Sequence, residues 1–216
     1  LQDRSINTIY KPADSHEGIL DICLDYNGEK FLYSGIDLES HTFQLYEMNI
    51  DGTGKRQVTP FMDEIDHYNG IYLPNGKILF CSTASLNSVP CVSGNDYVGT
   101  LFEINPDGTG MRQVCFDQEN DWYPWVKESG RIMYSRWEYT DNAHYFTRIL
   151  MTMNPDGTNQ ASHYGSNSYW PNSLFFAKPC PDHASKFIGV ISGHHGTARS
   201  GELILFDPAL GRKEAD

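Results

Sequence analysis

A motif of the type Asn-Pro-Asp-Gly-Thr recurs at intervals of about 50 residues, and this repeat constrains the fold more than any other feature. It occurs at 105–109 and 154–158, as a variant at 49–53, and as a weak trace at Asp207-Pro208. Asp-Gly favours a tight hairpin turn because glycine adopts positive φ without steric cost, and the preceding Asn-Pro disfavours helix. The flanking residues alternate with a period of two, so each copy predicts a strand, a turn and a second strand.

Four short antiparallel strands in a repeat of about 50 residues are typical of a β-propeller blade. No segment shows sustained helical periodicity or helix caps. We therefore expect an all-β fold, a β-propeller of four-stranded antiparallel blades with about four blades in this chain, either closed or as a fragment of a larger propeller. We expect a lead-in segment, or the last strand of an absent neighbouring blade, followed by the blades; these ranges are 1–15, then about 16–60, 61–116, 117–165 and 166–216.

The bulk composition excludes several classes of function. The net charge is −12, which argues against nucleic acid binding because that function needs a basic surface. The negative charge serves solubility or attracts a cationic ligand or metal. We expect no transmembrane segment, since no apolar run is long enough, and the first residues do not form a signal peptide.

The chain has five cysteines at irregular spacing, an odd number that does not predict a disulfide framework. Cys23, Cys81 and Cys115 lie in strand-like runs, so we expect them to be buried as small apolar residues. Cys81 and Cys91 could pair if the protein is exported. No Cys-x-x-Cys-His motif is present, so the sequence predicts no haem attachment in this chain.

Blade geometry predicts which face carries function. The Asp-Gly turns lie on one face, whereas the loops that lead into the first strand and join the second and third strands lie on the opposite face, at the mouth of the channel. Residues able to bind a ligand collect in both kinds of loop on that face. The predicted ligand-binding residues are Asp66, His67, Asp121, Trp122, Arg136, Trp137, Glu138, Tyr169 and Trp170.

Histidines and a cysteine on the same face could bind a divalent metal such as Zn²⁺, with Cys91, His194 and His195 as the expected ligands. Adjacent histidines on a strand point to opposite sides, so one metal would take both only if the flanking glycines bend the backbone. The alternative for each histidine is an ordinary surface or hydrogen-bonded residue. For Trp122, Trp137 and Trp170 the alternative is packing between blades.

We expect no catalytic residue, because the chain contains no nucleophile elbow, Walker loop or dinucleotide fingerprint. The hairpins resemble the propeller repeats of the TolB type. A tighter resemblance, to the propeller of hydrazine synthase alpha-subunit-like proteins, rests on six strings of residues. These are Tyr72-Leu73-Pro74-Asn75-Gly76-Lys77-Ile78-Leu79-Phe80, Val89-Pro90-Cys91-Val92-Ser93-Gly94, Arg136-Trp137-Glu138-Tyr139-Thr140-Asp141, Gly165-Ser166-Asn167-Ser168-Tyr169-Trp170-Pro171-Asn172-Ser173, Ser192-Gly193-His194-His195-Gly196 and Gly201-Glu202-Leu203-Ile204-Leu205-Phe206-Asp207-Pro208.

The resemblance implies a propeller and a periplasmic or otherwise exported location, in a family whose members are often longer and carry c-type haem segments after the propeller. It does not bring the activity, because hydrazine synthesis needs haem. The sequence therefore predicts a non-enzymatic scaffold or binding domain that presents its channel-mouth face to a missing C-terminal domain, a partner protein or a small ligand. The alternative is part of a metal- or haem-dependent enzyme, either a redox protein or a metal-dependent lyase-like propeller, whose cofactor domain is absent from this chain.

Overall fold

The computed structural model describes residues 5–12, 17–89, 94, 96–138, 148–165, 173–192 and 200–212. Within these ranges the chain is all β, as expected, and no helix is long and apolar enough to cross a membrane. The strands of the first two repeats are β1 (Ile19–Leu24), β2 (Lys30–Ile36), β3 (Phe43–Asn49), β4 (Arg56–Gln57), β5 (His67–Tyr72), β6 (Ile78–Ser82), β7 (Thr100–Ile104) and β8 (Arg112–Gln113). The later strands are β9 (Asn120–Val126), β10 (Ile132–Trp137), β11 (Arg148–Met153), β12 (Ala161–Tyr164), β13 (Leu174–Pro179), β14 (Phe187–Ile191) and β15 (Glu202–Phe206).

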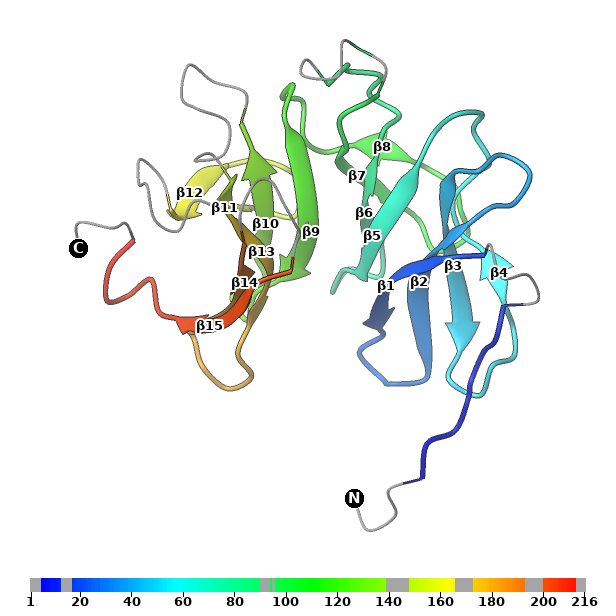
Figure 1. The fold of residues 1–216 in the computed structure, drawn as a ribbon, viewed down its shortest axis with the longest axis horizontal. Coiled ribbons are helices and arrows are strands. Elements are labelled where there is room, and N and C mark those ends of the chain that lie inside the picture. The colour runs from blue at the N-terminus through cyan, green and yellow to red at the C-terminus, as the bar shows by residue number, and fades with distance from the viewer. Residues whose placement is uncertain are drawn as a thin grey trace.

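These strands form four antiparallel sheets, one for each repeat, in a four-blade propeller arrangement. Blade 1 holds β1 to β4, blade 2 holds β5 to β8 and blade 3 holds β9 to β12, each with strands in chain order. Blade 4 has, within the described residues, the three strands β13, β14 and β15, as the sequence of the fourth repeat predicts. Figure 1 shows the sheets following one another around a common centre, with β1, β5, β9 and β13 innermost.

The Asp-Gly turns have the geometry that the motif predicts. Gly108 has a φ of 85°, and the Asp107 Oδ1 accepts hydrogen bonds from the backbone N–H of Thr109 at 3.0 Å and from its hydroxyl at 2.7 Å. The turns at Asp51 and Asp156 repeat these bonds. A Cβ on Gly108 would lie less than 3.0 Å from the carbonyl oxygen of Val58 in the preceding blade. The motif therefore forms the hairpin and also fits it against the neighbouring blade.

Apolar side chains between adjacent blades form the core. Leu32 and Leu45 of blade 1 pack on Phe80 and Phe102 of blade 2. A second cluster joins blades 2 and 3 and contains Cys81 and Cys115, both fully buried as expected, and a third joins blades 3 and 4. Cys23 is only half-buried, because it lies on the innermost strand beside the channel.

The inner strands share an irregularity that decides where their side chains point. The pairing shifts register within β5, β9 and β13, at the bulged residues Asn69, Tyr123 and Phe176, whose φ values are 53°, 53° and 54°. An extra residue in a strand bends it and redirects the neighbouring side chains. The rings of Tyr123 and Phe176 meet in the channel with centroids 4.4 Å apart.

Candidate functional site at the channel mouth

A cavity of about 520 Å³ opens where the loops before the innermost strands meet the loops after the second strands. Three of the residues predicted to bind a ligand line it, namely Asp66, Trp122 and Trp137. The other lining residues come from strands and loops of blades 1 to 3; they are Leu20, Phe43, Tyr68, Asn69, Thr83, Val89, Asp96, Tyr97, Asn120, Tyr123 and Arg148.

One wall of this mouth pocket is aromatic and carries a cation. The rings of Trp122 and Trp137 lie 5.8 Å apart with an interplanar angle of 36°. The guanidinium of Arg148 lies over the Trp137 ring at 4.2 Å and reaches toward Phe175 at 5.9 Å. A guanidinium on an aromatic face keeps its charge while its apolar stem is covered, so this wall offers both stacking surface and positive charge.

The other side of the mouth pocket is acidic. Asp66 Oδ1 accepts a hydrogen bond from the Phe43 N–H at 2.8 Å, and the Asp66 N–H donates to the Thr83 hydroxyl at 2.9 Å. Burial raises the pKa of Asp66; the Phe43 N–H opposes this shift, and the nearby charge of Asp96 adds to it. The pocket can therefore place a polar or charged group between carboxylates and the guanidinium of Arg148.

His67, Asp121, Trp122, Arg136 and Trp137 lie in strands, not in loops as the sequence analysis placed them. The side chains alternate along a strand, so only part of this set can face the mouth. Trp122 and Trp137 do so, whereas His67 is fully buried, with its ring 5.5 Å from Phe80 in the packing between blades 1 and 2. Burial lowers the pKa of His67 to about 4, with the Pro60 carbonyl opposing the shift, so this histidine is neutral near pH 7.

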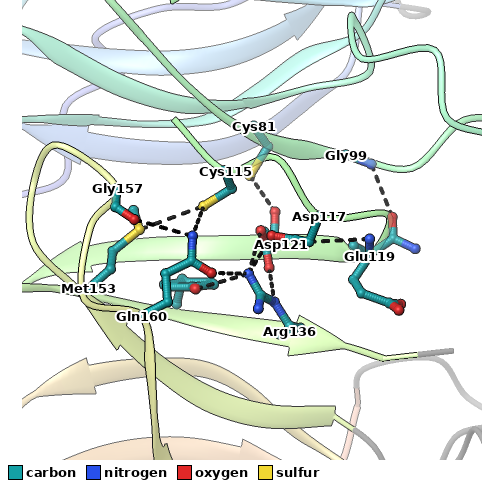
Figure 2. Close-up of polar contacts among 12 residues, drawn as sticks. Cys81, Gly99, Cys115, Asp117, Glu119, Asp121, Arg136, Met153, Gly157 and Gln160 are labelled. Carbon is teal, nitrogen blue, oxygen red and sulfur yellow. Dashed lines mark hydrogen bonds and ion pairs between the residues drawn. The ribbon is translucent and has the colours of Figure 1, made fainter. Parts of the chain in front are cut away.

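Asp121 of β9 and Arg136 of β10 form a buried ion pair across two adjacent strands of blade 3. Figure 2 shows Arg136 directed at Asp121, with the Arg136 Nε donating to Asp121 Oδ1 at 2.8 Å. The same guanidinium also binds Asp117 Oδ2 at 2.6 Å and Gln160 Oε1 at 2.9 Å. Burial raises the pKa of Asp121 to about 7, and the hydrogen bonds and charge of Arg136 oppose that shift.

The same group contains the one arrangement among the described residues whose ligand atoms could hold a metal, formed by Cys115, Asp117 and Asp121 with ligand atoms within 4.8 Å of one another. Burial raises the pKa of the Cys115 thiol well above its usual range, which disfavours the thiolate that a metal requires. Since Arg136 already forms ion pairs with both carboxylates, the geometry fits a structural ion pair better than a metal centre.

The remaining predicted residues divide into two groups. Glu138 directly follows β10 and is partly buried, but it does not line the mouth pocket. Tyr169, Trp170, Cys91, His194 and His195 lie outside the described residues. Asn120 and Arg148 did not follow from the sequence. Asn120 carries no local signal beyond adjacency to Asp121, and Arg148 is the first residue of β11.

Comparison with known proteins supports the fold. No family model and no curated protein sequence matches the chain. Hydrazine synthase of Kuenenia stuttgartiensis matches with a TM-score of 0.72 and 18% identity over 88% of this chain and 31% of that chain. A TolB protein of Agrobacterium tumefaciens matches with a TM-score of 0.53 and 19% identity over 66% of this chain and 49% of that chain.

An oligogalacturonate lyase in complex with manganese matches with a TM-score of 0.61 and 16% identity over 95% of this chain and 54% of that chain. The chain spans about half of the length of the TolB chain and about a third of the hydrazine synthase chain. At these identities the likeness shows the propeller fold, in agreement with the TolB-type and hydrazine synthase resemblance of the repeats, and it does not transfer an activity.

Proposed function

We propose that this chain is a binding scaffold that presents the mouth pocket to a small ligand or to a side chain of a partner domain or protein. The observation that supports this most is the convergence of Trp122, Trp137, Arg148 and Asp66 in one cavity of about 520 Å³. A concave site with aromatic walls and a few convergent polar groups is the usual form of a ligand site. Structural needs alone do not require two carboxylates and a stacked guanidinium around a cavity.

Binding of small probes tests this proposal. We would screen a fragment library of small carboxylates and amines by ligand-observed NMR against the chain and against W122L and W137L. Fragments that bind the chain should lose binding to both variants. W125L is the matched control, because Trp125 lies on the same strand but lines the channel instead of the mouth pocket. Unchanged binding in W122L and W137L, or equal loss in W125L, would contradict the proposal.

A second candidate function is part of a metal- or haem-dependent enzyme. It draws on the likeness to an oligogalacturonate lyase in complex with manganese, whereas the grouping of Cys115, Asp117 and Asp121 fits a structural ion pair better. One Zn²⁺ or Mn²⁺ per chain, lost in H194A or H195A, would support the metal version. An absence of metal together with an unchanged melting temperature in chelator would count against it. A downstream Cys-x-x-Cys-His in the full gene would support the haem version.

The proposal includes a partner domain and an exported location. It draws on the resemblance to hydrazine synthase alpha-subunit-like proteins and on the share of that chain that this one covers, 31%. The exported location is tested by fusing the full gene to a reporter whose signal depends on exposure to the periplasm. A reporter signal confined to the cytoplasm would contradict this location.

A further inference from the structure

Two blades expose apolar faces that other blades bury. Leu32 and Leu45 of blade 1 pack on blade 2, so side chains of the opposite parity point away from it. On that far side of β1, Ile22 and Leu24 are 62% and 57% exposed. In blade 4, Phe187 and Phe206 pack on blade 3, and their neighbours point to the other side, where Leu203 and Leu205 are 68% and 63% exposed.

These two faces correspond to the two sides of the interface that joins neighbouring blades. Each blade has a preceding face, which packs on the blade before it in the chain, and a following face, which packs on the blade after it. Within the chain this packing occurs three times in succession. The preceding face of blade 1 and the following face of blade 4 are those left over. Among the described residues no comparable packing joins the strands of these two blades, and β15 and β1 lie on either side of an opening in the ring in Figure 1.

Residues 5–12 lie where the outer strand of a blade preceding blade 1 belongs. A Cβ on Gly108 or Gly157 would meet, at less than 3.0 Å, the carbonyl oxygen of Val58 or Val114, and each valine directly follows the fourth strand of the preceding blade. A Cβ on Gly52 would meet the carbonyl oxygen of Ile9 in the same way. Ile9 therefore occupies the position relative to the turn of blade 1 that Val58 and Val114 occupy relative to the turns of blades 2 and 3.

Side-chain contacts hold that segment on blade 1. The Lys55 Nζ donates to the Tyr10 hydroxyl at 2.6 Å and lies 4.6 Å from the Tyr10 ring centroid. The Tyr10 ring lies 6.0 Å from the ring of Tyr33, which is 1% exposed. Residues 5–12 are thus held in place as the outer part of a blade. Among the described residues of this chain, no inner strands of that blade lie beside them.

We propose that a second copy of this chain supplies those strands. Its blade 4 packs on the preceding face of blade 1, and residues 5–12 run beside its β15 as a fourth strand, which its blade 4 lacks within the described residues. The first copy's blade 4 packs on the second copy's blade 1 in the same way. Two copies joined head to tail close a ring with two-fold symmetry about the channel, and both exposed faces of each copy become buried.

Sedimentation velocity on the chain and on variants of exposed residues tests this inference independently of the mouth pocket. The chain should sediment as a dimer, whereas I22D and L205D should each sediment as monomers. F116D is the matched control, because Phe116 is 77% exposed in the loop between β8 and β9, and it should stay dimeric. Far-UV circular dichroism confirms that each variant remains folded.

Mixing the two variants distinguishes a head-to-tail contact from a self-complementary one. I22D keeps an intact blade 4 face and L205D keeps an intact blade 1 face, so an equimolar mixture should form a dimer through one interface. A chain that is monomeric at every soluble concentration would overturn the inference, as would a dimer that survives I22D or L205D. A mixture that stays monomeric would overturn the head-to-tail arrangement.

Discussion

At the scale of single residues, the ion pair of Asp121 and Arg136 shows how a sequence pattern typical of binding can serve structure instead. The guanidinium has Asp117, Asp121, Tyr134 and Gln160 as partners, and it ties the loop between β8 and β9 to blade 3. Such a pair contributes modest net stability, but removal of one partner leaves the other charge buried without compensation. The residues next to it in sequence, Trp122 and Trp137, carry the candidate site.

We therefore predict that R136M lowers the free energy of unfolding by about 3 to 5 kcal/mol, since it leaves Asp121 buried without its cation. The double variant D121L/R136M should recover a large part of that loss, because the uncompensated charge is gone. Urea denaturation followed by circular dichroism measures both. Equal stability of R136M and the unchanged protein would show that the buried Asp121 does not depend on the charge of Arg136.

His67 gives a prediction about pH. Its pKa is about 4 in the folded protein against an ordinary value of 6.5, so the unfolded chain binds more protons at His67 between these values. The contribution of His67 to stability is therefore fully present above pH 6.5, and about 3 kcal/mol of it is lost as the pH decreases through 4. H67F should show a smaller loss in urea denaturation between pH 7 and pH 4.5. An identical loss in both proteins would contradict the assignment.

At the scale of elements, the Asp-Gly turns have two functions that substitution can separate. Gly108 needs positive φ and also close approach to Val58, whereas Gly76 has a φ of 83° with no atom within 4 Å of a Cβ. We predict that G76A costs about 1 to 2 kcal/mol, the cost of the left-handed conformation alone. G108A should cost about 1 to 3 kcal/mol more, because the methyl group overpacks the contact between blades.

Thermal and urea unfolding of G76A and G108A measure that difference. Equal stability of the two variants would show that the Val58 contact does not constrain the turn.

The turns, the blades and the burial of Cys81 and Cys115 followed from the sequence because they depend on local chemistry, namely glycine at positive φ and alternating strands. The first part of the inner strand of blade 3 did not follow, since the bulge at Tyr123 and Pro124 interrupts the alternation and leaves only Trp125 and Val126 as a recognisable strand. Arg148 was missed because its contact with Trp137 spans a hairpin whose register the sequence does not fix.

At the scale of the whole molecule, the central claim is that function lies at the channel mouth, opposite the repeated turns that shape the blades. The repeat defines the fold, and the fold brings Asp66, Trp122, Trp137 and Arg148 together from strands and loops of two blades.

Crystals of the chain soaked with a library of small carboxylates and amines test this claim most directly. We predict that bound fragments concentrate in the mouth pocket, stacked on Trp122 or Trp137 and in contact with Arg148 or Asp66. An empty mouth pocket in every soak, with fragments bound instead beside the Asp51, Asp107 and Asp156 turns, would contradict the account.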